Sequence, residues 1–441
     1  MTRACYRPVA AVAVAVAVAV AGGVVAAPPQ LKAFVLTDVH VDNTYTAGSD
    51  PTTNCQRGQG NASAFGSYLC DTPIAMLDAA LAAMRAVEPA PDFVFWLGDQ
   101  VPYVSSGRSM DEVTEGNANL TAKILKTFPH TRLLPVIGNH DTFPVDQQKA
   151  GDPNGSAARF LPLWNQFLSP ASHATFLQGG YYTELLRPGV RAVVINNALW
   201  MRDNKLEHAA ADPGGMYAWA DATLTAAAQA NETVWLLGHV PLGGPSAPDQ
   251  PTHGPGPVLD FAWNQKFLKQ LQRHSAAIKF QVYGHLHDDT LRLVPASAAG
   301  GAAVGVQFAA PSLTTWTHEN PRFRLLDFDA ASGQLLNYAQ FYARLDQCEA
   351  AGRISFTKEY DAAAEYGLTD VGDPAQWESL VGGMEGGGGK WPAYWAHYHG
   401  RGSELSCNST CQRMQVCRIK AVALPSYYAQ CELGPLPPPI A

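Results

Sequence analysis

Short apolar runs recur along the first two thirds of the chain, and each ends at a glycine or a polar residue. Runs of this length, rich in β-branched and aromatic side chains, are typical of buried strands. They predict six strands, at Ala33–Leu36, Phe93–Leu97, Leu133–Ile137, Ala192–Ile195, Val234–Leu237 and Phe280–Tyr283. Apolar residues at helical spacing predict helices between them, at Thr72–Val87, Trp219–Ala230 and Phe261–Arg273. This alternation of strands and helices indicates an α/β fold with a central sheet.

The hydrophobic pattern changes after about residue 345, where aromatic clusters and four closely spaced cysteines replace the strand pattern. Inside the first region, the Pro- and Gly-rich segment Pro241–Pro257 predicts a long loop. We therefore divide the chain into a leader at residues 1–27, a main domain at residues 28–345 and a C-terminal subdomain of helices and disulfides at residues 346–441.

The first 27 residues have the pattern of a secretory leader. Arg3 and Arg7 precede an apolar Ala/Val run, which ends at two glycines and is followed by small residues. A charged region, an apolar region and a small-residue exit are the three parts of a signal peptide. The apolar run is shorter than the roughly 20 residues that a membrane span needs. We expect cleavage after Ala26 or Ala27 and no stable membrane anchor in the mature chain.

Charge narrows the range of partners. Only 15% of the 441 residues are charged, against about 25% in globular proteins, and the formal net charge is −8. Removing the leader, with its two arginines and no acids, changes this charge to −10. Polynucleotide binding relies on a basic surplus that neutralises phosphates. We therefore expect no nucleic-acid polymer as a partner.

Cysteines and glycosylation signals agree with export. Cys5 lies in the leader, and the seven remaining cysteines are an odd number, so one thiol stays free or pairs with another molecule. Five Asn-x-Ser/Thr triplets are expected N-glycan sites, namely Asn61, Asn119, Asn154, Asn231 and Asn408. Together with the leader, these features predict a protein that is secreted or resides in the lysosomal or endomembrane lumen.

Five of the six predicted strands are followed by residues of types that commonly bind metals. These residues are Asp38, His40, Asp99, Asn139, His239, His285 and His287, with His140 beside Asn139. Because ligand sites of α/β sheets lie beyond the carboxyl ends of strands, we expect these side chains to converge. Carboxylates, imidazoles and an amide suit two divalent metals, which together clamp the attacking and leaving oxygens of a displacement at phosphorus.

A single histidine after a strand is more often structural than a ligand, but five such motifs in order favour a metal site. Six histidines lack this context and are interpreted as surface or core residues, namely His130, His173, His208, His253, His274 and His318. His397 and His399, which lie among aromatic residues near the C-terminus, are interpreted as packing residues.

This pattern resembles the calcineurin-like metallophosphoesterase superfamily and, within it, the acid sphingomyelinase-like phosphodiesterases. The resemblance spans roughly residues 31–431 and rests on the metal-binding motifs, on the segment Gly138–Pro144 with Gln147, and on the cysteine spacing. It implies an α/β metallophosphoesterase β-sandwich flanked by helices, with a small disulfide-bonded helical C-terminal subdomain. It also implies the disulfides Cys55–Cys70, Cys407–Cys411 and Cys417–Cys431, which leave Cys348 as the odd thiol.

The same resemblance implies a role for each site residue. One zinc ion would be held by Asp38, His40, Asp99 and His287. A second would be held by Asp99 as a bridge, Asn139, His239 and His285. Hydroxide between the metals would attack phosphorus, and His140 would protonate the leaving oxygen because imidazole titrates near working pH. Alternatively, His140 donates a hydrogen bond to phosphate without transferring a proton.

Two departures from the family pattern bear on substrate and mechanism. Tyr103 stands where the family usually has a second active-site histidine, and a phenol with a pKa near 10 is a poorer acid than imidazole. About ten mature residues precede Asp38, too few for the lipid-handling saposin domain of acid sphingomyelinase. We therefore expect a small soluble phosphodiester substrate, such as a nucleotide or a headgroup compound, rather than membrane sphingomyelin.

Two other functions remain open. A phosphomonoesterase or nucleotidase of the same superfamily is the nearest enzymatic alternative, although the tyrosine position of purple acid phosphatases is occupied here by Pro102. A secreted binding protein that keeps the fold without activity is the other, and the intact set of ligands argues against it. The loops that would shape the pocket are Tyr103–Glu115, Pro241–Pro257 and Thr314–Asn320.

Overall fold

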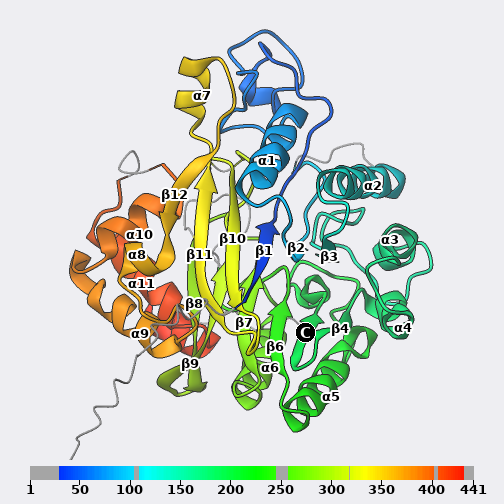
Figure 1. Cartoon of the computed structure of the whole chain (residues 1–441), viewed down its shortest axis with the longest axis vertical. Coiled ribbons are helices and arrows are strands. Elements are labelled where there is room, and N and C mark those ends of the chain that lie inside the picture. Colours follow the sequence, from blue (N-terminus) through cyan, green and yellow to red (C-terminus); the bar gives the residue numbers. More distant parts are fainter. Residues whose placement is uncertain (1–28, 104–108, 245–256, 317, 402–405, 432–441) are drawn as a thin grey trace, which may run out of the picture.

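Two six-stranded sheets with helices around them form the structure, a computed structural model (Figure 1). The structure describes residues 29–103, 109–244, 257–316, 318–401 and 406–431. The predicted leader at residues 1–27 and most of the predicted loop Pro241–Pro257 lie outside these ranges.

The first sheet has the strand order β12-β11-β10-β1-β2-β3. Its strands are β1 (Gln30–Leu36), β2 (Phe93–Trp96), β3 (Arg132–Pro135), β10 (Arg322–Asp329), β11 (Leu335–Tyr342) and β12 (Thr357–Asp361). Strands β1, β2 and β3 are parallel to one another, whereas β10 runs antiparallel to β1 and begins an antiparallel half. The three parallel strands therefore end at the same edge of this sheet.

The second sheet has the order β4-β5-β6-β7-β9-β8 and repeats this arrangement. Its strands are β4 (Tyr182–Arg187), β5 (Val190–Val194), β6 (Thr233–Leu237), β7 (Ile278–Tyr283), β8 (Thr290–Ser297) and β9 (Gly300–Ala309). Strands β5, β6, β7 and β9 are parallel, and β4 and β8 are antiparallel edge strands. Each sheet thus contributes one set of parallel strands with a shared carboxyl edge.

The six predicted strands are confirmed as β1, β2, β3, β5, β6 and β7, but they do not form one central sheet. Three lie in each of the two sheets, as the family resemblance implied. The pattern missed β4 and β8 to β12, in part because buried cations interrupt their apolar runs. Arg292 in β8 and Arg322 and Arg324 in β10 are at most 1% exposed.

The two sheets pack face to face through aromatic side chains. Trp235 on β6 is fully buried, and its ring stacks on Phe328 of β10 with the centroids 4.0 Å apart. Phe93 and Phe95 of β2 meet the same indole edge-on. The Trp235 Nε1 group donates a hydrogen bond of 2.7 Å to the carbonyl oxygen of Gly333. This contact holds β2, β6 and β10 in one core.

Helices cover the outer faces of the sheets (Figure 1). The helices of the first three quarters of the chain are α1 (Ile74–Val87), α2 (Met110–Thr127), α3 (Ser156–Trp164), α4 (Pro170–Gly179), α5 (Met216–Gln229) and α6 (Phe261–Arg273), with short 3-10 helices η1 (Pro51–Thr53), η2 (Asn197–Trp200) and η3 (Pro213–Gly215). The predicted helices are confirmed as α1, α5 and α6. Helix α2 begins with a capping box, in which Ser109 and Glu112 each bond the other's backbone N–H.

The remaining helices belong to the C-terminal quarter. They are α7 (Leu345–Ala351), α8 (Ala362–Tyr366), α9 (Pro374–Gly383), α10 (Trp391–Tyr398), α11 (Ser409–Lys420) and α12 (Leu424–Gln430), with η4 (Glu385–Gly387). Helix α9 packs on β8 and β9 and α11 on β8, whereas α8 packs on β11 and β12 (Figure 1). The domain boundary at residue 345 stays a prediction, and β12 beyond it pairs with β11 in the first sheet.

The three expected disulfides are confirmed, at Cys55–Cys70, Cys407–Cys411 and Cys417–Cys431. Cys348 is buried, and it is a free cysteine among the residues that the structure describes. Among the described helices, none is both long enough and apolar enough to cross a membrane.

The sheet interface yields a stability prediction. Trp235→Phe removes the indole N–H that bonds the Gly333 carbonyl and leaves a gap against Phe328. We expect a loss of about 1–3 kcal/mol in the free energy of unfolding, from the unpaired carbonyl and the lost packing. Urea unfolding followed by circular dichroism measures it. Trp219→Phe on half-buried α5 is the control, and an equal loss in both variants would contradict a special role for the interface.

Candidate metal centre

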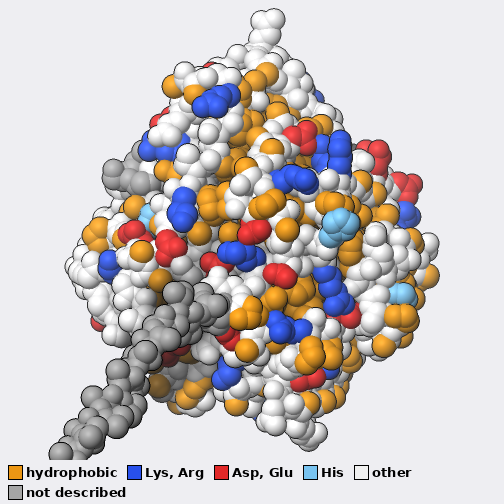
Figure 2. Space-filling model, in the orientation of Figure 1, with side chains coloured by type: hydrophobic (Ala, Val, Ile, Leu, Met, Phe, Trp, Pro, Cys, Tyr) orange, Lys and Arg blue, Asp and Glu red, His pale blue; other side chains and the backbone are white. Residues whose placement is uncertain are grey.

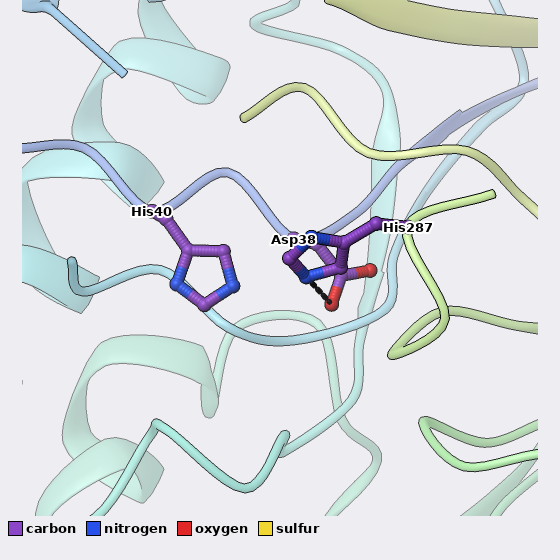
Figure 3. A group of neighbouring side chains, drawn as sticks. All are labelled: Asp38, His40 and His287. Atoms are coloured by element: carbon purple, nitrogen blue, oxygen red, sulfur yellow. Dashed lines mark ion pairs between the residues drawn. The ribbon is translucent and has the colours of Figure 1, made fainter. Parts of the chain in front are cut away.

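The loops after β1, β2, β3, β6 and β7 bring the predicted metal-binding side chains together. Asp38, His40 and His287 form one group, whose ligand-type atoms lie within 4.8 Å of one another (Figure 3). A second group of the same size consists of Asp99, His239 and His285. All six side chains are buried. The parallel strands of both sheets therefore deliver their end residues to one place.

Asp99 lies between the two groups. Its Oδ2 atom is 3.2 Å from His239 Nε2 and 3.7 Å from His40 Nε2. Asn139 completes the second group, because its Oδ1 atom is 2.8 Å from His239 Nε2 and 2.9 Å from His285 Nδ1. The position of Asp99 is the one that a bridging carboxylate between two ions would occupy.

The donor atoms fit divalent cations. Nitrogen and oxygen donors bound to one zinc at about 2.0–2.2 Å are separated by about 3–3.5 Å. In the first group, His287 Nε2 is 3.4 Å from Asp38 Oδ1 (Figure 3). Among the described residues, no hydrogen-bond partner reaches the buried His40 Nε2 atom. A buried imidazole nitrogen without a partner, facing carboxylates, is the kind of atom that a metal would satisfy.

The backbone at the site is strained. Five of the predicted ligands adopt left-handed φ angles between 40° and 68°, namely Asp38, His40, Asp99, His285 and His287. Non-glycine residues seldom adopt this conformation, and it concentrates at functional sites. The loops approach so closely that a Cβ atom on Gly138 would collide with Asp99 Oδ1, which explains the glycine of the Gly-Asn-His-Asp motif.

Backbone carbonyls orient two of the imidazoles. The Nδ1 atom of His40 lies 2.7 Å from the Val101 carbonyl oxygen, and that of His239 lies 2.7 Å from the Leu97 carbonyl oxygen. A carbonyl accepts only from a protonated nitrogen, so Nδ1–H is the donor in both rings. The Nε2 atoms therefore face Asp99, and each becomes a possible metal ligand when its ring is neutral.

Asp141 anchors the loops after β2 and β3. Its carboxylate accepts from the backbone N–H groups of Asp99 at 2.8 Å, Gly138 at 2.9 Å and Gln100 at 3.1 Å. The Asn117 amide of α2 adds a bond at 3.2 Å. Sequence reasoning assigned this residue no role, although its place next to the Asn-His pair was a signal.

Two further supporting residues were missed. Asn197 of η2 accepts from the backbone N–H groups of His239 at 3.1 Å and Val240 at 3.0 Å, which fixes the loop after β6. Asp146 accepts from Asn139 Nδ2 at 2.8 Å, which turns the Asn139 oxygen toward the histidines. No local motif marks either residue, because both contacts depend on how distant loops pack.

The ionisable side chains of the site are buried, and this burial shifts their pKa values. Burial raises the pKa of Asp99 to about 6, against the lowering effect of His239. Burial alone would also raise the pKa of Asp38, but the hydrogen bond and charge of His287 hold that pKa well below its usual range. Burial lowers the pKa of His40 to about 3. Burial alone would lower the pKa of His239, but the charge and hydrogen bond of Asp99, together with the charge of Asp38, raise it to about 9.

His140 and Tyr103 lie beside the two groups. The His140 ring is 4.9 Å from the His40 ring, and the Tyr103 ring is 4.6 Å from His140, centroid to centroid. Tyr103 also stacks on Trp316 at 5.7 Å. Tyr103 and Trp316 are half-buried, unlike the six buried members of the groups. Trp316 lies in a loop expected to shape the pocket, and nothing in the sequence singled it out.

The two C-terminal histidines do more than pack. His397 lies 3.0 Å from Glu359 Oε1, and His399 pairs with both Asp288 and Glu319. Asp288 directly follows His287, so the His399 pairs reach the edge of the metal centre. Asp288, Glu319 and His399 form a third cluster of ligand-type atoms within 4.8 Å of one another.

Comparison with known proteins agrees with this geometry. Residues 31–289 match the family model of the calcineurin-like phosphoesterases, and residues 303–433 match that of the acid sphingomyelin phosphodiesterase C-terminal region. The chain is 32% identical to the sphingomyelinase phosphodiesterase C of Dictyostelium discoideum, over 88% of this chain and 90% of that protein.

Two human proteins show similar coverage. The acid sphingomyelinase-like phosphodiesterase 3b is 30% identical over 92% of this chain and 90% of that protein. The cyclic GMP-AMP phosphodiesterase SMPDL3A is 28% identical over 89% of this chain and 88% of that protein. The chain thus belongs to the calcineurin-like phosphoesterase family, among its acid sphingomyelinase-like phosphodiesterases.

Proposed function

We propose that this chain is an exported phosphodiesterase that uses two divalent metal ions, zinc in the first instance, to hydrolyse small soluble phosphodiesters and phosphoanhydrides. The single observation that carries this proposal is the Asp99 oxygen lying between two buried three-residue groups. Asp38, His40, Asp99 and His287 would hold one ion. Asp99, Asn139, His239 and His285 would hold the other.

Two cations held there would supply positive charge to phosphate oxygens and lower the pKa of water that attacks phosphorus. The chain's own residues provide the remaining chemistry. Asp38 and Asp99 are buried carboxylates that offset the ionic charge, and the carbonyls of Val101 and Leu97 keep two imidazoles in the ligating tautomer. Hydrolysis adds water to phosphorus and breaks the bond to the leaving oxygen, which then needs a proton.

His140 is the proposed proton donor to that oxygen. Its backbone N–H donates to Asp99 Oδ1 at 2.8 Å, so its position is tied to the proposed bridging carboxylate. Its ring contacts those of His40 and Tyr103, which also lie next to each other, and Tyr103 is half-buried. Tyr103 would hydrogen-bond a phosphate oxygen rather than transfer a proton, because its phenol is the weaker acid.

The proposed substrate is a soluble diester. The names of the relatives refer to sphingomyelin and to cyclic GMP-AMP as substrates of those proteins. The aromatic pair Tyr103 and Trp316 beside the metal centre offers flat surfaces to an organic group on phosphate. On the face shown in Figure 2, acidic and basic side chains are interspersed among the described residues, which offers no broad basic surface to a polyanion.

Export is the proposed route. All five asparagines of the glycosylation triplets are exposed, which glycan transfer requires. Three disulfides suit an oxidising compartment. We therefore propose secretion or a lysosomal or endomembrane lumen, with N-glycans at these sites.

A substrate panel tests the proposed activity. Glycosylated protein from the culture medium of a secreting host would be assayed near pH 5 and near pH 7, with bis-p-nitrophenyl phosphate, nucleoside triphosphates, p-nitrophenyl phosphate and sphingomyelin in detergent. We expect the soluble diester and anhydride to be hydrolysed fastest. Faster hydrolysis of the monoester would favour a phosphomonoesterase, and inactivity of the metal-loaded protein would favour a binding protein.

The acid role of His140 predicts a specific loss. His140→Ala removes the proposed proton donor and none of the proposed ligands. We expect kcat to fall by about 10²-fold or more, with two metals still bound. Steady-state kinetics and metal analysis on the same preparation measure both. A diester with a p-nitrophenol leaving group, which needs little protonation, should lose less than one with an alcohol leaving group, and an equal loss would contradict the acid role.

The charge state of His239 predicts proton release on metal binding. Because its pKa is raised to about 9, its imidazole is protonated at pH 7 and must lose that proton to bind a metal. We expect zinc binding to release protons at pH 7 and to become tighter as pH rises toward 9. Above about pH 9 the free His239 imidazole is already neutral, so it should no longer release a proton. Titration calorimetry in buffers of different ionisation enthalpy measures the release. Zinc binding at pH 7 without proton release would contradict this assignment.

A further inference from the structure

The third cluster is a closed network of charges next to the metal centre. Asp288, Glu319 and Arg322 are fully buried, and His399 is largely buried. Arg322 Nη2 pairs with Glu319, while His399 Nδ1 pairs with Glu319 and lies 3.1 Å from Asp288. Burial alone would lower the pKa of His399, but the two facing carboxylates raise it to about 10.

Two buried carboxylates therefore face two positive groups. A cation bound among Asp288, Glu319 and His399 would have to displace the His399 proton and compete with the Arg322 guanidinium for Glu319. Buried charges are stable when they are paired and hydrogen-bonded. The cluster is accordingly a set of ion pairs, and its significance lies in what it touches.

Arg322 connects three parts of the chain. Its guanidinium Nη1 donates to the carbonyl oxygens of His397 at 2.7 Å and Tyr398 at 3.2 Å, which belong to the end of α10. Nη2 donates to Glu319 and also, at 3.3 Å, to the carbonyl oxygen of His287. One planar fork thus spans the C-terminal helix and the backbone of a proposed metal ligand.

Helix α10 reinforces the same loop at other points. The Tyr398 hydroxyl donates to Asp288 Oδ2 at 2.9 Å, and the Asp289 N–H donates to the Tyr398 carbonyl at 3.0 Å. The Tyr394 hydroxyl lies 2.8 Å from Thr290 Oγ1. Helix α10 thus contacts the segment from residue 287 to residue 290 at several points, in addition to the Ser312 N–H, which donates to the His287 carbonyl at 3.0 Å, and Arg324, which pairs with Asp289.

We propose that Arg322 is a positioning residue for His287. Through it, α10 fixes the His287 loop and sets the metal affinity of the group Asp38, His40 and His287. The strained left-handed backbone of His287, with φ at 62°, needs such external support. This inference rests on the proposed two-metal site, and it gives the C-terminal region a role in metal binding.

Arg322→Lys tests the proposal. A lysine keeps the charge, but its single ammonium cannot reproduce the planar fork. Zinc titration against a chromophoric competitor should show two binding steps in the wild type. We expect Arg322→Lys to weaken one step by about tenfold or more, as the loss of a ligand's supporting contact does, and to leave the other step unchanged. Added free zinc should restore hydrolysis of bis-p-nitrophenyl phosphate.

Arg324→Lys is the matched control. Arg324 lies on the same strand, is equally buried, and bonds Asp289 and Gln340 instead of a proposed ligand. Both variants should lower the thermal midpoint, because both disturb a buried ion pair. Only Arg322→Lys should change zinc affinity. The proposal would be overturned if the two variants bound zinc with equal affinities. It would also be overturned if Arg322→Lys showed two binding steps with the affinities of the wild type.

A second pair of variants applies if Arg322→Lys does not fold. His399→Gln removes the charge that holds Glu319 and Asp288, and His397→Gln is its control, because His397 pairs with Glu359 away from the ligands. We expect weaker zinc binding at one step in His399→Gln alone, and the same affinity in both variants would overturn the proposal. A wild-type protein that binds no zinc would instead reject the two-metal function on which the inference rests.

Discussion

The face-to-face packing of the two sheets is the constraint on which the candidate metal centre depends. Each sheet brings its parallel strands to one edge, and the stacking of Trp235 on Phe328 holds the sheets together. Because the loops after β1 to β3 come from one sheet and those after β6 and β7 from the other, neither sheet alone forms either group. Asp99 from the first sheet and His239 from the second are 3.2 Å apart only because the sheets are held in this relation.

Much of this arrangement was predictable from the sequence. Parallel strands are buried on both faces, so β1, β2, β3, β5, β6 and β7 read as continuous apolar runs. The residues after them carry recognisable metal chemistry. The strands β4 and β8 to β12 were missed, in part because residues such as Arg324 are polar in sequence and buried in the fold. The supporting roles of Asp141 and Asn197 were missed as well, because hydrogen bonds between distant loops create them and no local spacing encodes them.

The buried acids near the candidate metal centre are stabilised in three different ways. Asp38 and Asp99 face imidazoles, at distances that suit two ligands of one cation. Asp141 accepts backbone and amide N–H groups and needs no counter-ion. Glu319 forms ion pairs with Arg322 and His399, which are side chains of the same chain, so it needs no added cation. This separation of roles explains why three clusters of ligand-type atoms can lie close together while two of them suit metals.

The left-handed backbone of Asp38, His40, Asp99, His285 and His287 has a consequence for how such proteins diverge. Glycine adopts these angles without steric cost, whereas other residues pay roughly 1 kcal/mol or more at each position. Replacing one of these proposed ligands by glycine would relieve backbone strain at that position and remove a side chain that the proposed metal site needs. The strain at these positions therefore serves the proposed metal site rather than the stability of the fold. A duplicated copy released from selection for activity would keep its architecture, so inactive folded relatives are an expected product of this design.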